Sequence, residues 1–148
     1  MKILIIFIFA ILLAGCVKQN TWKPIEYQNV SSGNAESAKQ EIALEINSEK
    51  EWEDVWKGVF KTDSIEVPLP SIDFAKETVF AVFLGEKNTG GYSASITKIY
   101  ESDNQVEVKI SATKPGPGSM VTESFTYPYI IVKTKKINKP ASFSWNWT

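Results

Sequence analysis

The amino-acid sequence predicts a β-rich α+β domain, in which one amphipathic helix packs on an antiparallel sandwich or a partly open barrel. Three observations predict this class. Apolar and polar residues alternate in several short segments, only one segment has a helical repeat, and turn-forming residues separate most of the predicted strands. Consecutive strands joined by short turns pair antiparallel, so we expect the helix to cover one face or one end of the sheets.

The first predicted strands come before the helix. Residues 25–30 are expected to form a short strand, and residues 31–37 a loop, because the loop segment is rich in Ser, Gly and Asn. Ile42, Leu44 and Ile46 then alternate with Glu and Ala residues, which is typical of a half-buried strand.

A helix is predicted to begin after Asn47. The Ser48 hydroxyl can accept a hydrogen bond from the backbone N–H of Glu51, whose carboxylate can reach back, as in a capping box. Large apolar residues then recur on one helical face, at Trp52, Val55, Trp56, Val59 and Phe60. The two tryptophans could form a ligand platform, but this spacing is more typical of core residues. We therefore expect both of them in the core.

The second half of the chain is predicted to contain strands only. The prolines in residues 67–70 indicate a connection, and residues 78–84, apolar on both faces, indicate a central strand. Further strands are expected over residues 92–100, 106–112, 121–125, 129–134 and 142–147, with the weakest pattern at 121–125. Loops or turns are expected over residues 85–91, 102–105 and 115–119.

The N-terminus carries the pattern of an export signal that ends in a cysteine. Lys2 precedes an apolar run over residues 3–13, which is shorter than the ~20 residues that a membrane-spanning helix needs. Leu13-Ala14-Gly15-Cys16 resembles a bacterial lipobox, in which Cys16 is diacylated, the peptide before it is removed and the new N-terminus is acylated. The alternatives are an uncleaved membrane helix or a signal with an incidental cysteine.

This pattern divides the chain and predicts where it is located. We expect residues 1–15 to be a lipoprotein signal peptide, 16–38 the lipid anchor, tether and first edge segment, and 39–148 the β-rich domain. The protein would lie in the cell envelope, anchored through Cys16 to the extracytoplasmic side of a bacterial membrane. Val17 is compatible with the outer membrane if the cell has two membranes.

The composition narrows the chemistry. The chain has no histidine, no arginine and a single cysteine. Histidine-based nucleophilic mechanisms and histidine-ligated metals are therefore excluded, and with its thiol assigned to lipid the chain has no disulfide or zinc cluster. We expect no cofactor and no metal. The formal net charge of −1 and the lack of arginine argue against nucleic-acid binding.

The remaining polar side chains do not predict a catalytic site. Asp73, Glu77, Glu86 and Glu123 are carboxylates without a motif that pairs them at working distance. Ser93 and Lys98 could be imagined as a catalytic pair, but their odd separation predicts opposite faces of one strand. The sequence therefore predicts a protein that is not an enzyme.

Two loops are the candidate interaction surfaces. The first contains Asn88, Thr89, Gly90, Gly91 and Tyr92; glycines there permit positive φ and the close approach of another backbone. The second contains Pro115, Gly116, Pro117 and Gly118 and extends to Met120; its two prolines lower the ordering cost of binding. Tyr127 and Tyr129 are candidate aromatic anchors. The alternative is that the two glycines only form a turn, with Tyr92 packed inward.

These loops, in this order, resemble the PrcB C-terminal domain family. The segment from Phe83 to Ser93 resembles that family's strand followed by a Gly-Gly-Tyr loop, and the segments 115–122 and 127–133 resemble its proline-rich loop and Pro-Tyr strand. The segment 51–56 resembles the Trp-containing helix that precedes the domain, so the likeness covers about residues 40–136. The resemblance implies a non-catalytic accessory module that binds or stabilises an exported protein, with a protease as the candidate partner.

Two alternatives remain. Asn88 to Tyr92 partly resembles the projecting loop of chagasin-type protease inhibitors, although a proline is missing, one glycine replaces a threonine and no Arg-Pro-Trp loop exists. A protease inhibitor that uses the Gly-Gly-Tyr loop is the first alternative. The second is a structural envelope lipoprotein whose loops matter only for folding.

Overall fold

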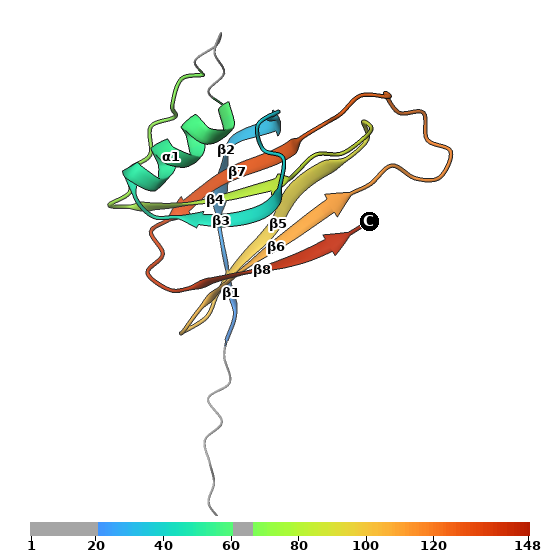
Figure 1. Ribbon diagram of the computed structural model, residues 1–148. Helices are drawn as coiled ribbons and strands as arrows, with labels where there is room; N and C mark the ends of the chain where they lie inside the picture. The colour runs from blue at the N-terminus through green and yellow to red at the C-terminus, as the bar shows by residue number, and fades with distance from the viewer. Residues whose placement is uncertain (1–20, 61–66) are drawn as a thin grey trace, which may run out of the picture.

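The computed structural model describes residues 21–60 and 67–148, which form one helix and eight strands (Figure 1). The predicted signal peptide and Cys16 lie outside the described residues. The elements are β1 (Lys23–Ile25), β2 (Tyr27–Asn34), β3 (Glu41–Ile46), α1 (Glu49–Phe60), β4 (Glu77–Leu84), β5 (Ser93–Glu101), β6 (Val106–Thr113), β7 (Pro128–Lys135) and β8 (Ala141–Trp147).

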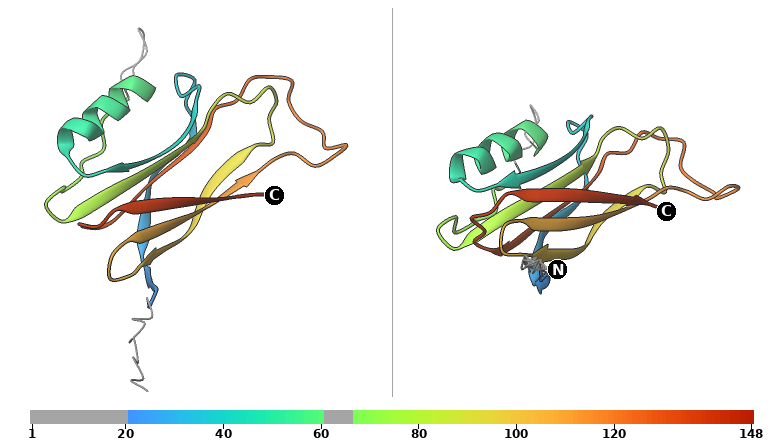
Figure 2. Two further views of the ribbon diagram at one scale, coloured as in Figure 1. Left: turned by 60° about the horizontal axis from the view of Figure 1, so that its bottom comes forward. Right: turned by 90° about the horizontal axis from the view of Figure 1, so that it is seen from below.

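The strands form two four-stranded sheets that pack as an open sandwich, with α1 on the outer face of one of them (Figure 2). One sheet has the order β1-β5-β6-β8 and the other β2-β7-β4-β3. The predicted α+β class is thus confirmed, and the sandwich alternative holds. Every pairing is antiparallel except that of β6 with β8, which is parallel. The exception arises because β7 lies in the other sheet, so the chain crosses back before it enters β8.

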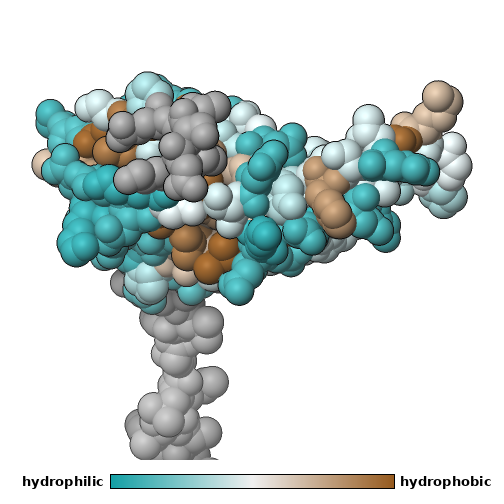
Figure 3. Space-filling model, turned by 45° about the horizontal axis from the view of Figure 1, so that its top comes forward, coloured by the Kyte–Doolittle hydropathy of each residue, from teal (hydrophilic) through white to brown (hydrophobic). Residues whose placement is uncertain are grey.

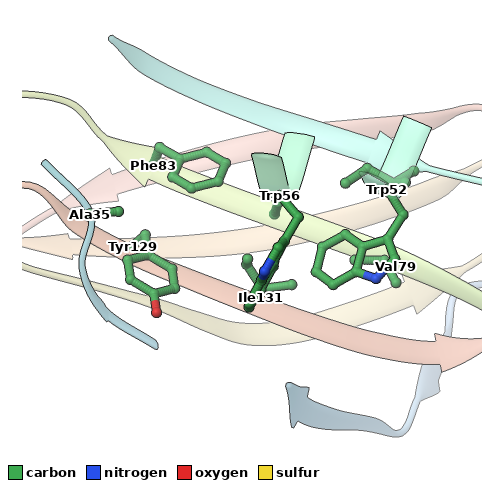
Figure 4. Packing of buried hydrophobic residues seen from close by; sticks show 9 residues of the cluster. Ala35, Trp52, Trp56, Val79, Phe83, Tyr129 and Ile131 are labelled. Carbon is green, nitrogen blue, oxygen red and sulfur yellow. The ribbon is translucent and has the colours of Figure 1, made fainter. Parts of the chain in front are cut away.

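The hydrophobic core has two layers that share β4. Between the sheets, Phe80 and Val82 of β4 pack against buried residues of the other sheet, including Ile99 and Val108. On the other face, Val79 and its neighbours pack against the helix (Figure 4). The prediction of a central strand over residues 78–84 is therefore confirmed: every residue of β4 after Glu77 is buried.

The helix contributes both tryptophans to the second core layer, as predicted. Trp52 is 1% exposed and Trp56 is 5% exposed. Their indole N–H groups donate to the backbone oxygens of Pro70 (2.9 Å) and Val67 (3.0 Å), so the proline-containing connection is held against the helix. A buried indole N–H needs such a partner.

The start of α1 follows the predicted capping box with one change. The Ser48 hydroxyl accepts from the Glu51 N–H (3.3 Å), but the Glu51 carboxylate accepts from the N–H of Asn47 at 3.0 Å. The hydrogen bond from Asn47 lowers the pKa of Glu51, because it favours the ionised form.

Three local predictions are wrong. The segment 25–30 is divided between β1 and β2, and β2 continues through the predicted loop to Asn34. Pairing with β7 along this whole length, with a bulge between Asn29 and Ser31, overrides the turn preference of these residues. Residues 121–125 form no strand; the pairing nearby is an isolated bridge between Lys87 and Thr126.

The faces of Ser93 and Lys98 were also predicted wrongly. A register shift in β5 between Ile96 and Lys98 inserts one residue, so both side chains are exposed on the outward face. They are separated along the strand by roughly 15 Å, from the rise of a β-strand. This distance, and not opposite faces, keeps them from forming a catalytic pair.

Candidate functional site

The two candidate loops lie side by side and are joined by hydrogen bonds. The backbones of Lys87 and Thr126 exchange two bonds of 2.8 and 2.9 Å, and the Gly90 N–H donates to the oxygen of Thr122 (2.9 Å). The Thr126 hydroxyl donates to the oxygen of Thr89 (2.7 Å). We call residues 114–127 the arm and residues 85–92 its base. Figure 1 shows the arm extending beyond the sheets.

The paired glycines of the base are required by this packing. A methyl group on Gly90 would overlap the Thr122 hydroxyl. Gly91 has a φ of +85°, and a Cβ there would lie 3.0 Å from the Cβ of Pro115 and 3.1 Å from Cγ1 of Val121. The chain that approaches these glycines closely is therefore the protein's own arm. Close packing against the arm accounts for Gly90, and this packing together with the positive φ accounts for Gly91.

Lys87 organises the charged side of the base. Its ammonium lies 3.6 Å from the carboxylate of Glu41, 5.9 Å from the ring centroid of Tyr92 and 5.2 Å from that of Trp147. These distances are within the range of cation–π contacts. Tyr92 is half-buried, so its ring forms part of the support of the arm. Thr148 also holds the start of the arm, because its backbone oxygen accepts a hydrogen bond from the N–H of Lys114 (2.9 Å).

The two tyrosines proposed as anchors have different environments. Tyr127 is half-buried, and its hydroxyl donates to the carboxylate of Glu86 (2.9 Å). This hydrogen bond raises the pKa of Tyr127, because it favours the neutral phenol. Tyr129 is 8% exposed, and its ring packs against Phe60 and Phe83 at centroid distances of 5.0 and 6.0 Å. Tyr129 is therefore a core residue, and the prediction that it is an exposed anchor for a partner is wrong.

The outer part of the arm exposes apolar side chains. Met120 is fully exposed and Phe125 is 62% exposed. Gly118, with a φ of +78°, lies in the turn closed by the bond from the Ser119 N–H to the oxygen of Gly116 (3.1 Å). Figure 3 shows the projecting arm with hydrophobic surface on it. Phe125 is not among the residues predicted for the site; its signal in the sequence is a single large aromatic residue within a polar segment of Thr, Glu and Ser.

The remaining predicted site residues lie in the arm and its base and are exposed or half-buried. Asn88, Gly116, Pro117 and Gly118 are exposed, and Thr89 and Pro115 are half-buried. The predicted loops thus form one feature, with its glycines and Tyr92 at the base and its apolar residues further out. Such a feature can contact another protein through apolar side chains and backbone groups.

Within residues 21–60 and 67–148, no three acidic, histidine or cysteine side chains gather so as to hold a metal ion. In the same part of the chain, no helix is both long and apolar enough to cross a membrane.

Part of the chain matches a known protein family. Residues 78–135 match the model of the family described as PrcB C-terminal. The match runs from β4 to β7 and includes both the base and the arm, which confirms the resemblance for these residues. The helical segment 51–56 lies outside the match. No curated protein and no solved structure matches the chain.

Proposed function

We propose, from the PrcB C-terminal segment that residues 78–135 form, that this protein is a non-catalytic accessory module of an exported protease complex. The observation that carries the proposal is the arm, which lies inside the matched segment and exposes Met120 and Phe125. Interfaces are enriched in Met and aromatic residues at their centres, whereas an isolated domain gains nothing by leaving such side chains in water.

The structure of the arm favours binding. Backbone hydrogen bonds join Thr122 and Thr126 of the arm to Gly90 and Lys87 of the base. Pro115 and Pro117 also restrict the backbone of the arm. A segment that is ordered before it binds loses less conformational entropy on association. The arm can therefore present its apolar residues to a partner at low cost.

We also propose that Cys16 anchors the protein to the extracytoplasmic side of a bacterial membrane. The start of the described chain and the arm lie at opposite ends of β5. Lys23 pairs with Glu101 at one end of this strand. The arm begins after Thr113, which pairs with Ser93 at the other end. β5 spans roughly 25 Å between these ends at the rise of a strand. The chain that leads from Cys16 would therefore enter the described domain at the end of β5 opposite to the arm.

The first prediction concerns the anchor. Cells that express the wild-type protein and are given labelled palmitate should incorporate label into it, and Cys16→Ala should remove this label completely, because the acylated thiol is absent. Cys16→Ser serves as a near-isosteric control and should behave as Cys16→Ala does. Label retained by either variant would show that Cys16 is not the site of acylation.

The second prediction concerns the arm. A photo-crosslinking amino acid in place of Ser119 should capture an exported protein in intact cells, whereas one in place of Asn104, in the turn at the other end of β5, should not. Adding Met120→Ser and Phe125→Ser should lower the yield at position 119 by about tenfold, while thermal unfolding stays nearly unchanged, because exposed side chains contribute little to stability.

Three outcomes would contradict the accessory function. Equal capture from positions 104 and 119 would show that the arm is not the binding surface. Loss of thermal stability in the double variant would favour the structural lipoprotein. Inhibition of papain by the fragment of residues 17–148, abolished by Tyr92→Ala, would favour the protease inhibitor.

A further inference from the structure

One edge of the second sheet is open beside the helix. β3 is the last strand in the order β2-β7-β4-β3, so within the described residues no strand pairs with its outer edge. β3 pairs with β4 over six residues without a register shift. β2, at the other edge of the same sheet, contains a bulge. A regular open edge presents unpaired N–H and C=O groups and is a template for another strand.

An apolar groove of about 400 Å³ runs along this edge. We call it the β3 groove. It lies between β3 and α1 and is lined by Ala38, Ile42, Leu44, Val55, Val59 and Phe83. Ile42 is 42% exposed there. Side chains of a strand added to β3 would alternate in direction, so every second one would point into this groove.

A glycine in the helix keeps the groove open. Gly58 lines it from the last turn of α1, and a Cβ built on this residue would have no described atom within 4 Å. Glycine in a helix interior costs about 1 kcal/mol relative to alanine. Among the described residues, neither a clash nor a positive φ requires glycine at this position. The contacts of the described residues therefore do not explain Gly58, whereas space for an occupant of the groove does.

Two charged side chains line the groove, Lys39 and Asp54. The Asp54 carboxylate pairs with the ammonium of Lys50 on the same helix (2.9 Å), whereas Lys39, immediately before β3, has no ion pair within the described part of the chain. A strand that pairs antiparallel to β3 runs from Ile46 toward Glu41, so its last residues would lie beside Lys39. An acidic side chain at that end would complement the ammonium group.

We infer that the β3 groove binds an extended segment of another protein by strand addition. The added strand pairs antiparallel to the outer edge of β3, places alternate apolar side chains between β3 and α1, and ends in an acidic side chain beside Lys39. Main-chain hydrogen bonds supply affinity in this mode, and the groove and the charge supply selectivity. The inference depends neither on the arm nor on lipid anchoring, and it gives the protein a second interaction surface.

A defined peptide tests the inference on the full-length protein in detergent. The probe is a fluorescein-labelled peptide amide of the sequence Ser-Val-Thr-Val-Ser-Val-Glu, with parallel versions that carry Ile, Leu or Phe at the valine positions. Fluorescence anisotropy should show saturable binding of at least one version. Methylation of alternate backbone nitrogens on the edge that faces β3 should abolish binding, because it removes the donors of the added strand.

Two substitutions separate the groove from the fold. Gly58→Leu should weaken peptide binding at least about tenfold by filling the groove, while thermal unfolding stays unchanged or rises, since leucine is a better helix former. Glu49→Leu, on an exposed position of the same helix, is the matched control and should leave the affinity unchanged. Lys39→Glu should weaken binding about fivefold, and a peptide that ends in Lys should recover it.

The following results would overturn the inference. No saturable binding of any version up to ~1 mM, or equal binding of the methylated peptides, excludes strand addition. Unchanged affinity in Gly58→Leu excludes the groove. Self-association in sedimentation that Gly58→Leu abolishes would show that a second copy of this chain, and not another protein, occupies the edge.

Discussion

Trp52→Ala is expected to lower the free energy of unfolding by about 3–5 kcal/mol, the usual cost of removing a buried tryptophan. The side chain is 1% exposed, lies 5.0 Å from Trp56 between ring centroids, and fills the layer between α1 and the sheet. The substitution leaves a cavity in this layer and also removes the donor to the oxygen of Pro70. Such a loss is a large fraction of the stability of a typical domain.

Denaturant unfolding followed by circular dichroism measures this effect. Trp22→Ala is the control, because Trp22 is 37% exposed and lies before β1. The control should change stability by less than about 1 kcal/mol. A similarly small effect for Trp52→Ala would mean that the helix does not pack on the sheet as described.

Gly85→Ala is expected to cost about 2–4 kcal/mol, because strain and steric overlap act together. Gly85 has a φ of +73°, which L-residues with a side chain rarely adopt. A Cβ there would lie 2.8 Å from the backbone nitrogen of Glu41 and 2.9 Å from both the carbonyl carbon of Gln40 and the oxygen of Lys39. Backbone atoms cannot move aside as a flexible side chain can.

Two other glycines separate the two causes. Gly118 has a φ of +78° but nothing within 4 Å of its Cβ, so Gly118→Ala should show the backbone strain alone, about 1 kcal/mol. At Gly116 the nearest atom is the Ser119 Oγ at 3.5 Å, an ordinary contact, so Gly116→Ala should be close to neutral. Equal thermal unfolding of the Gly85 and Gly116 variants would contradict the close packing of residues 39–41 on Gly85.

The position of Gly85 also links the two proposed surfaces. The residue follows β4 and is the first residue of the base of the arm, and a Cβ on it would meet the segment that leads into β3. The Glu86 N–H donates to the oxygen of Lys39 (3.2 Å) just beyond it. We therefore expect Gly85→Ala to disturb the arm and the β3 groove together, so it should not be used to test either one alone.

Local pattern was sufficient to predict most elements. The period of two in β3 and β6, the helical repeat of α1 and the apolar run of β4 each follow from how one element meets a core. The same reasoning placed Trp52 and Trp56 inside. The resemblance to the PrcB C-terminal family could also be recognised from residues 83–93 and the proline-rich loop, and the matched segment includes both.

The candidate site was predicted only in part, because its residues acquire their roles through contacts between distant segments. Tyr129 and Tyr127 are two residues apart, yet one is buried against Phe60 and the other bonds to Glu86. Phe125 looked unremarkable in sequence and is exposed on the arm. The extension of β2 to Asn34 likewise depends on its pairing with β7.

The sequence by itself determined the β-rich class, the helix and the central strand, because periodicity and capping act between residues close along the chain. The sequence also determined that histidine-based catalysis and histidine-ligated metals are excluded, because the chain has no histidine and composition does not depend on folding. Only the tertiary structure decided the parallel pairing of β6 with β8, the joining of the two loops into an arm and the open edge of β3 beside Gly58. These features arise from backbone pairing and packing between segments tens of residues apart, which no local pattern encodes.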